Sequence, residues 1–212
     1  MTPIIDVTSP IDLRQMSDAK DWANTALQKR PARTEFFNSF ATAIVNYQKP
    51  NLHILELGSG PGFLAQHLLN TVYVTEYVAL DFSGAMHQLA QERLGTHADK
   101  MQFIERSFKD DNWIAGLEKF DMVITMQAVH ELRHKSYAVN LFKQVQQLLK
   151  PEGMFLVCDH YAGTDGNGAQ GMQNDQLYMT IAEQYSALQH AGFSKIRQLL
   201  VLQGMVLHQA QL

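Results

Sequence analysis

The sequence predicts an α/β domain built on a doubly wound, mostly parallel sheet. Apolar strands alternate with helical segments from residue 52 onward, the first strand runs directly into a glycine-rich turn, and the chain ends in a hairpin that turns at Gln203 and Gly204. Alternating strands and helices favour a parallel sheet with helices on both faces. The terminal hairpin predicts that the last strand runs antiparallel to its neighbours.

The N-terminal residues predict two helices ahead of the sheet. Residues 18–29 and 33–48 have helical character, whereas residues 1–17 are expected to be loose. The second helix carries an apolar face at helical intervals, made of Phe36, Phe37, Phe40, Ile44 and Tyr47. We therefore expect residues 1–50 to form a helical cap or lid and residues 51–212 to form the sheet domain.

Seven strands are expected in order, alternating with helices up to the terminal hairpin. The strands lie within residues 52–57, 72–80, 101–105, 120–126, 154–159, 196–202 and 205–209, and the helices over 61–70, 83–94, 137–149 and 174–191. Pro61 suits the first turn of its helix. The apolar run at 120–126 is typical of a strand covered on both faces. The glycine-rich residues 162–178 have the composition of a mobile flap.

Composition and charge exclude several classes of protein. The 212 residues carry a formal net charge of −4 with no basic run, so nucleic acid is not an expected partner. No apolar stretch reaches the ~18–20 residues of a membrane span, and the N-terminus lacks the features of a signal peptide. The single cysteine, Cys158, excludes an internal disulfide framework and fits a reducing cytosol. We expect a soluble cytoplasmic protein, monomeric or homodimeric.

A glycine loop follows the first strand and predicts a ligand site. Residues 54–62 read Ile-Leu-Glu-Leu-Gly-Ser-Gly-Pro-Gly, which places Gly58, Gly60 and Gly62 at alternate positions. Glycines after a buried strand let backbone amides approach a ligand that a Cβ would hold away. A dinucleotide fingerprint would need its third glycine at position 63, which is Phe63, and no Lys-Ser/Thr pair is present to hold a triphosphate.

Two carboxylates flank this loop in the sequence. Glu56 precedes the first glycine by two residues, and Asp81 closes the second strand, 19 residues after Gly62. Ligands of open α/β sheets bind beyond the carboxyl ends of the strands, and an acid at the end of a strand can accept hydrogen bonds from both hydroxyls of a ribose. The simpler alternative for Asp81 is a helix cap.

This pattern of an acid followed by Gly-x-Gly-x-Gly resembles the first motif of the class I S-adenosylmethionine-dependent methyltransferases, and the likeness covers about residues 50–212. It implies a Rossmann-like sheet of seven strands with the last one reversed, S-adenosylmethionine as cofactor and S-adenosylhomocysteine as product. It also implies a set of cofactor-binding residues, which are Arg33, Glu56, Gly58, Ser59, Gly60, Gly62, Asp81, Phe82, Ser83, Ser107, Phe108, Met126 and Gln127.

Roles within this set follow from the resemblance. Asp81 is expected on the ribose and Phe82 against the adenine, while Met126 and Gln127 are expected near the methionine portion. Arg33 resembles an arginine that reaches the cofactor carboxylate in some relatives; the alternative is a solvated surface arginine. Ser107 departs from the family, because many members have an acid there that meets the adenine amino group.

Residues 130–134 read His-Glu-Leu-Arg-His and match the zinc-protease pattern His-Glu-x-x-His. That chemistry needs both histidines on one long helix, whereas here the motif directly follows a buried strand. A metal held by His130, His134 and His160 is the alternative, whereas we predict no metal. The resemblance instead implies that His130 lies beside the methyl donor, as a general base or as a packing residue.

Asp159, His160 and Tyr161 end the fifth strand and face the same cleft by topology, so His130, His160 and Tyr161 are the expected catalytic residues. The sequence thus predicts methyl transfer from S-adenosylmethionine to a small-molecule acceptor. A cofactor-binding module, a non-methylating user of the same cofactor and, remotely, a zinc hydrolase remain as alternatives. The acceptor and its accepting atom stay open.

Overall fold

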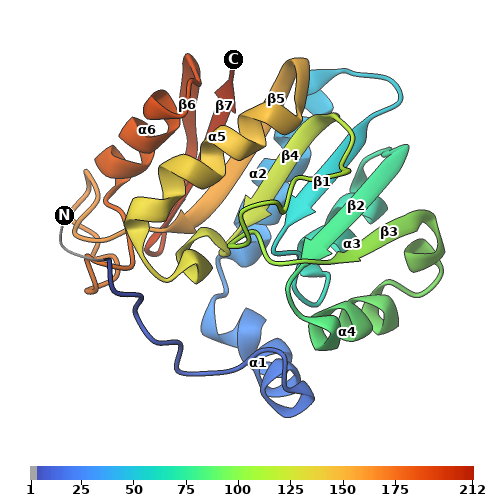
Figure 1. Cartoon of the computed structure of the whole chain (residues 1–212), viewed down its shortest axis with the longest axis horizontal. Helices are drawn as coiled ribbons and strands as arrows, with labels where there is room; N and C mark the ends of the chain where they lie inside the picture. The colour runs from blue at the N-terminus through green and yellow to red at the C-terminus, as the bar shows by residue number, and fades with distance from the viewer. Residues whose placement is uncertain (1–3) are drawn as a thin grey trace. The chain divides into compact units, whose positions relative to one another are not determined.

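The computed structural model describes residues 4–212, and its strands form a mixed seven-stranded sheet flanked by helices (Figure 1). The strands are β1 (His53–Leu57), β2 (Glu76–Asp81), β3 (Met101–Glu105), β4 (Phe120–Met126), β5 (Leu149–His160), β6 (Lys195–Leu202) and β7 (Met205–Gln211). The α-helices are α1 (Met16–Lys29), α2 (Arg33–Tyr47), α3 (Phe63–Thr71), α4 (Gly84–Leu94), α5 (Ala138–Leu148) and α6 (Ile181–His190). The short 3-10 helices are η1 (Gly95–Lys100), η2 (Val129–Leu132) and η3 (Lys135–Tyr137). The strand order is β3-β2-β1-β4-β5-β7-β6, which confirms the predicted fold class.

Residues 10–113 form one compact unit, which contains the glycine loop. In this unit β1 pairs in parallel with β2, and β2 pairs in parallel with β3. Leu57 lies opposite Leu80, and Asp81 lies opposite Glu105, so the three strands end at one edge. The N-terminal helices belong to this unit, because α2 packs against α3 and α1 packs against α4.

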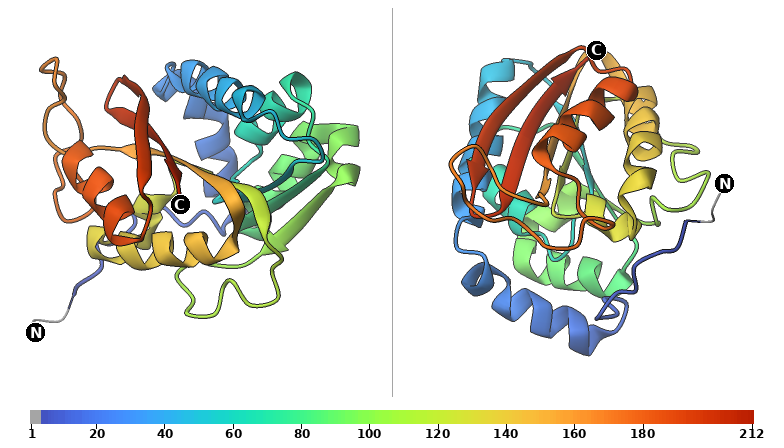
Figure 2. Two further views of the ribbon diagram at one scale, coloured as in Figure 1. Left: turned by 90° about the horizontal axis from the view of Figure 1, so that it is seen from above. Right: turned by 90° about the vertical axis from the view of Figure 1, so that its left-hand side faces the viewer.

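Residues 4–9 and 114–212 belong to the second compact unit, which contains β4 to β7. β4 and β5 are parallel, while β7 runs antiparallel to both β5 and β6 and forms the terminal hairpin drawn in red in Figure 2. Helix α5 packs on β4 and β5, and α6 packs on β6, β7 and α5. The predicted apolar strand β4 is buried from Phe120 through Thr125, as expected of a strand covered on both faces.

Two helices begin later than the sequence predicts. Helix α3 begins at Phe63, because Gly62 at its N-cap has a left-handed φ of 78° and Pro61 lies in the preceding turn. Helix α6 begins at Ile181 and not near 174. Asn174 accepts hydrogen bonds from the amides of residues 176 and 177, which stabilises a turn in place of a helix. Thr180 then starts the helix with a capping box.

His208 on β7 makes the folded state sensitive to acid. Its side chain is buried, with 1% exposed, and neither ring nitrogen has a hydrogen-bond partner within residues 4–212. Burial lowers the pKa of His208 from 6.5 to about 4. Because the unfolded chain then binds more protons across this range, the free energy of unfolding should fall as the pH drops from 6.5 toward 4.

We expect His208 to account for a loss of about 2 kcal/mol of stability between pH 7 and pH 5. Urea unfolding at the two pH values measures this loss, and His208→Leu should remove most of it. The matched control is His190→Gln at an exposed position on α6, which should keep the wild-type difference. An equal pH dependence in wild type and His208→Leu would contradict the assignment.

Within residues 4–212 no helix is both long enough and apolar enough to cross a membrane.

Candidate functional site

The glycine loop turns sharply between β1 and α3 and is fixed to β2. Gly58, Gly60 and Gly62 have φ values of 64°, 53° and 78°, a left-handed conformation that favours glycine. The amides of Gly58 and Ser59 both donate to the carbonyl of Leu80, at 2.8 and 3.2 Å. A Cβ on Gly62 would lie 3.1 Å from the Cβ of Ala90, so this glycine also permits α3 to pack against α4.

Asp81 connects this loop to the end of β2. Its side chain is buried, and its Oδ2 accepts a hydrogen bond from the amide of Gly60 at 2.8 Å. Its Oδ1 accepts one from the amide of Ser83 at 2.9 Å. Each carboxylate oxygen can accept more than one hydrogen bond. Asp81 can therefore hold the loop and still receive hydroxyl groups of a ligand.

The loop also contains a buried hydroxyl group that lacks a partner. Ser59 is 6% exposed, and no hydrogen-bond partner for its Oγ occurs within residues 4–212. Buried polar groups are nearly always paired, so an orphaned one calls for an explanation. A polar ligand against the loop would supply the missing partner.

The other residues predicted to bind the cofactor in this unit differ in their surroundings. Ser83 caps α4 by accepting from the amide of Met86 and donates to the carbonyl of Leu13, so its hydroxyl is engaged within the chain. Phe82 is half-buried under the guanidinium of Arg14, whose Cζ lies 4.7 Å from the ring centroid.

Arg33 is buried and stacks over Trp22 with its Cζ 4.8 Å from the ring centroid, so it is not a solvated surface arginine. Ser107 and Phe108 lie just beyond β3, after Arg106, and Phe108 is buried. The Oγ of Ser107 accepts a hydrogen bond from the amide of Lys109.

A second group of polar side chains lies at the ends of β4 and β5, in the other unit. The Asp159 carboxylate accepts from the amide of His130 at 2.9 Å and contacts His130 Nδ1 at 2.7 Å. It also accepts from the amide of His160 at 2.7 Å. One buried carboxylate thus fixes both histidines.

Aromatic and amide groups complete this cluster. The rings of His130, His160 and Tyr178 lie 5.5–5.8 Å apart between centroids. Gln127 has a left-handed backbone conformation, with φ of 57°. Its side-chain Nε2 lies 2.8 Å from the Nε2 of His160. We call His130, Glu131, Asp159, His160 and Tyr178 the histidine cluster.

The electrostatics of the histidine cluster favour a charged His130. Burial by itself would lower the pKa of this histidine, but the charge and hydrogen bond of Asp159, assisted by Glu131, raise it to about 10. Glu131 Oε1 lies 3.4 Å from His130 Nε2. The pKa of Asp159 is lowered: burial alone would raise it, but the charge and hydrogen bond of His130 outweigh that effect. His130 is therefore an imidazolium, which donates hydrogen bonds, and it can act as a base only after it loses a proton.

Tyr161 lies apart from the two histidines with which the sequence groups it. It is buried, its Oη is 3.5 Å from the carbonyl of Ala169, and a Cβ on Gly171 would clash with its ring. Its side chain contacts the loop after β5, and its backbone amide donates to the carbonyl of Gly204, in the turn between β6 and β7, at 3.1 Å. Burial and Asp165 raise the pKa of Tyr161. The structure thus brings His130 and His160 together, whereas the Tyr161 side chain contacts the loop after β5.

The helix required by the zinc-protease pattern is absent. His130 lies in η2, Arg133 then takes a left-handed conformation with φ of 68°, and His134 begins η3 with its Nδ1 bonded to Ser136. The two histidines are four residues apart in the sequence, but they do not lie on one α-helix. Within the described part of the chain, no group of three or more His, Cys, Asp and Glu side chains could hold a metal ion.

An N-terminal segment binds beside the histidine cluster, although the sequence predicts it to be loose. The amide of Val7 donates to the carbonyl of Arg133 at 2.8 Å, and Arg133 Nε donates back to the carbonyl of Val7 at 2.8 Å. Arg133 also donates to the carbonyl of Thr8 and lies 3.4 Å from Glu131. Residues 1–3 of the expected loose segment lie outside the described residues.

Sequence reasoning left Glu131 and Arg133 out of the methyltransferase site, and it placed Tyr178 only at the end of the expected flap over residues 162–178. For Glu131 a signal was present, since the residue adjoins His130. Asp159 was expected in the acceptor cleft but not as a catalytic residue, although a carboxylate before His160 at the end of a strand indicates a role. No periodic pattern indicates Tyr178, because it lies in an irregular segment before α6.

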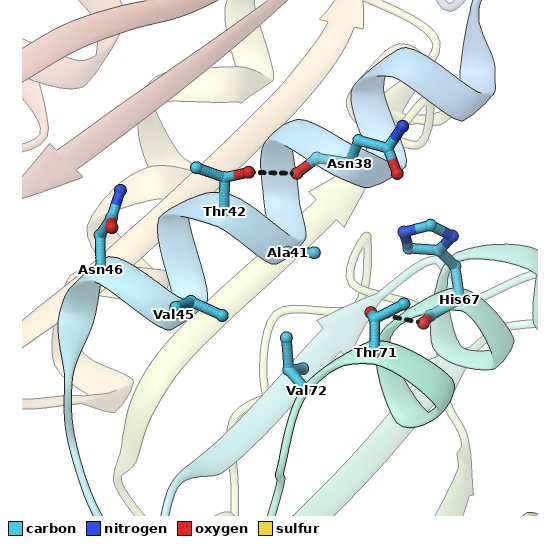
Figure 3. A pocket seen from close by; sticks show the side chains of 8 residues that line it. All are labelled: Asn38, Ala41, Thr42, Val45, Asn46, His67, Thr71 and Val72. Atoms are coloured by element: carbon cyan, nitrogen blue, oxygen red, sulfur yellow. Dashed lines mark hydrogen bonds between the residues drawn. The ribbon is translucent and has the colours of Figure 1, made fainter.

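A separate surface hollow of about 410 Å³ lies between α2 and α3. Its lining comprises Asn38, Ala41, Thr42, Val45 and Asn46 from α2, His67 and Thr71 from α3, and Val72 beyond it (Figure 3). None of the predicted cofactor-binding or catalytic residues lines it.

Comparison with known proteins finds methyltransferases among those that this chain resembles. A family model described as "Methyltransferase domain" matches residues 54–153. The reducing polyketide synthase Preu2 of Preussia isomera is 29% identical over 128 residues, which cover 57% of this chain and 5% of that protein. The chain thus spans about one twentieth of the length of this curated relative.

Solved structures share the fold. The CurJ carbon methyltransferase has a TM-score of 0.73 at 17% identity, over 95% of this chain and 61% of that one. Human N-acetylserotonin methyltransferase, in complex with S-adenosylmethionine, has a TM-score of 0.70 at 16% identity, over 94% of this chain and 57% of that one. The match at residues 54–153 and the seven-stranded fold confirm the resemblance of this chain to the class I S-adenosylmethionine-dependent methyltransferases.

Proposed function

We propose that this protein transfers a methyl group from S-adenosylmethionine to a small-molecule acceptor and leaves S-adenosylhomocysteine. The observation that carries the proposal is the glycine loop with its orphaned Ser59 hydroxyl and with Asp81 bound to the Gly60 amide at 2.8 Å. A buried carboxylate, left-handed glycines and an unpaired hydroxyl suit a ribose and an amino-acid portion. The residues present therefore fit the cofactor of the family.

Positioning is the main task of the protein in this reaction. When bound, the cofactor supplies a methyl group already activated on a sulfonium. Asp81 would hold the ribose hydroxyls, and the loop of Gly58, Ser59, Gly60 and Gly62 would approach the amino-acid portion. Arg33, Glu56, Phe82, Ser83, Ser107, Phe108, Met126 and Gln127 complete the proposed cofactor site. Orientation of reactants can supply about 7–11 kcal/mol of a barrier.

The histidine cluster would act on the acceptor. As an imidazolium held by Asp159, His130 can donate a hydrogen bond to an acceptor oxygen on which negative charge develops. Polyketide synthases and a carbon methyltransferase are among the proteins that this chain resembles. We therefore place the acceptor among small carbonyl compounds with an acidic C–H next to the carbonyl. His160 and Tyr178 would line its site, and Tyr161 would support it through the loop.

The proposal also covers the N-terminal helices, the class of acceptor, the cellular location and the oligomeric state. Residues 1–50 would act as a helical cap, and residues 51–212 would form the sheet domain. A free small molecule is favoured over nucleic acid as the acceptor, because the net charge is −4 without a basic run. A cytoplasmic location is supported by the single buried thiol of Cys158. The protein would be a monomer or a homodimer.

The test is methyl transfer from isotopically labelled S-adenosylmethionine to a panel of β-keto thioesters and phenols, read by mass spectrometry. We expect a carbon-methylated product, and we expect His130→Gln to lower kcat about 100-fold or more, the usual scale for a group that stabilises transition-state charge. The control His190→Gln should retain activity. Cofactor binding without product from either class would favour a non-catalytic binding module.

A further inference from the structure

Glu56 is a buried carboxyl group beside the glycine loop, and it lacks a cationic partner. It is 2% exposed, and no ion pair within residues 4–212 includes it. Its Oε2 accepts a hydrogen bond from the Tyr77 hydroxyl on β2 at 2.7 Å. Tyr77 is also 2% exposed, so the pair is enclosed at a point two residues before Gly58.

The surroundings of Glu56 favour its neutral form. Burial raises the pKa of Glu56 to about 8, the Tyr77 hydrogen bond opposes this rise, and the negative charge of Asp81 adds to it. Tyr77 and Asp81, both on β2, are the titratable groups that act on this carboxyl. Burial and Glu56 together raise the pKa of Tyr77 well above its ordinary value, so the phenol keeps its proton.

A neutral buried carboxyl group can ionise when a cation binds next to it. An isolated carboxylate in an apolar site is costly and neutralises itself, whereas an opposite charge at close range favours the ionised form. The amino-acid portion of S-adenosylmethionine carries an ammonium group, and the loop next to Glu56 is where the proposed function places it. The same loop contains the orphaned Ser59 hydroxyl, which independently indicates a polar ligand there.

We propose that Glu56 and Tyr77 form a proton-linked receptor for the ammonium group of the cofactor, in which Glu56 is protonated in the empty site and releases its proton to solvent when the cofactor binds. This inference rests on the proposed function. The only bond that breaks is the O–H bond of the Glu56 carboxyl, and the proton passes to the buffer. Tyr77 is a positioning residue, because its hydroxyl continues to donate to the carboxylate and keeps it beside the loop.

The test is calorimetric titration of the protein with S-adenosylhomocysteine in buffers of different ionisation enthalpy, between pH 6 and 8. We expect release of about one proton per cofactor near pH 7, and affinity that rises by up to about tenfold per pH unit below the pKa of Glu56. Glu56→Gln should bind more weakly, release no proton and lose this pH dependence. Circular dichroism checks that the variant folds.

The variant Tyr77→Phe distinguishes a role of Tyr77 in positioning the Glu56 carboxylate from a general role in stabilising the fold. Without the hydroxyl donor the pKa of Glu56 rises further, so we expect the affinity loss to be largest near pH 6.5 and to shrink toward pH 8. A purely structural role would weaken binding equally at every pH. This variant, together with the proton count of the wild type, keeps the proposal testable if Glu56→Gln fails to fold.

The outcomes distinguish this inference from the proposed function. Failure of S-adenosylhomocysteine to bind at any pH would overturn both. Tight binding with no proton release and with the same affinity at pH 6 and 8 would overturn the proton linkage and leave the methyltransferase assignment intact. Equal proton release by wild type and Glu56→Gln would also overturn it, because the proton would then come from another group.

Discussion

Replacing Asp159 by alanine is expected to lower the free energy of unfolding at pH 7 by about 3–5 kcal/mol, the usual cost of breaking a buried ion pair from one side. The Asp159 carboxylate contacts His130 Nδ1 at 2.7 Å and accepts from the amides of His130 and His160. Its removal leaves a half-buried imidazole and two backbone donors without their acceptor. Urea unfolding measures the effect.

The pH dependence gives this prediction a second readout. Because the folded pKa of His130 is raised from 6.5 to about 10, the stabilisation by its pair with Asp159 is fully present below pH 6.5 and is lost as the pH rises through 10. The gap between wild type and Asp159→Ala should therefore narrow from pH 7 toward pH 10. Asp175→Ala, at an exposed position in the same unit, is the matched control. A gap below ~1 kcal/mol at pH 7 would be no larger than that of an exposed ion pair and would contradict the pairing.

Replacing Asp81 by alanine is expected to weaken binding of S-adenosylhomocysteine at least 100-fold. Hydrogen bonds to a charged acceptor contribute about 1.5–3 kcal/mol each, so two ribose hydroxyls together account for about 3 kcal/mol or more. The variant also releases the Gly60 amide, which Asp81 Oδ2 accepts at 2.8 Å. Isothermal titration calorimetry measures the affinity.

Two further variants sharpen this test. Asp81→Asn keeps the size of the side chain but turns an NH₂ group toward the amide of Gly60 or Ser83, so it should bind the cofactor nearly as poorly as alanine. Asp99→Ala, at an exposed position in η1, should bind like wild type. Affinity of Asp81→Ala within about threefold of wild type would show that Asp81 does not hold the ribose, since hydrogen bonds lost from a charged group cost more than that.

The strands and the glycine loop were predictable because local sequence specifies them. Most strands contain a short apolar run, and the left-handed turn at Gly58, Gly60 and Gly62 tolerates few other residues. The antiparallel end of the sheet followed from the hairpin turn at Gln203 and Gly204. The start of α6 was predicted too early, because Asn174 competes for backbone amides that a helix would need.

The side-chain partners of the site were less predictable, because they depend on which strand ends adjoin one another. The bond between Asp159 and His130 spans 29 residues, and the bond between Glu56 and Tyr77 spans 21. Neither separation leaves a periodic signal. The attachment of Val7 to Arg133 joins residues 126 apart and is likewise invisible in local sequence. Burial of Arg33 against Trp22 depends on the packing of α1 and α2 in the same way.

A crystal structure of this protein with S-adenosylhomocysteine would locate the cofactor site. We expect the ligand on the glycine loop, with its ribose hydroxyls on Asp81, its amino group beside Glu56 and the Ser59 hydroxyl paired. Absence of the ligand from this loop at saturating concentration, or its binding in the hollow between α2 and α3, would show that the glycine loop is not the cofactor site (Figure 3).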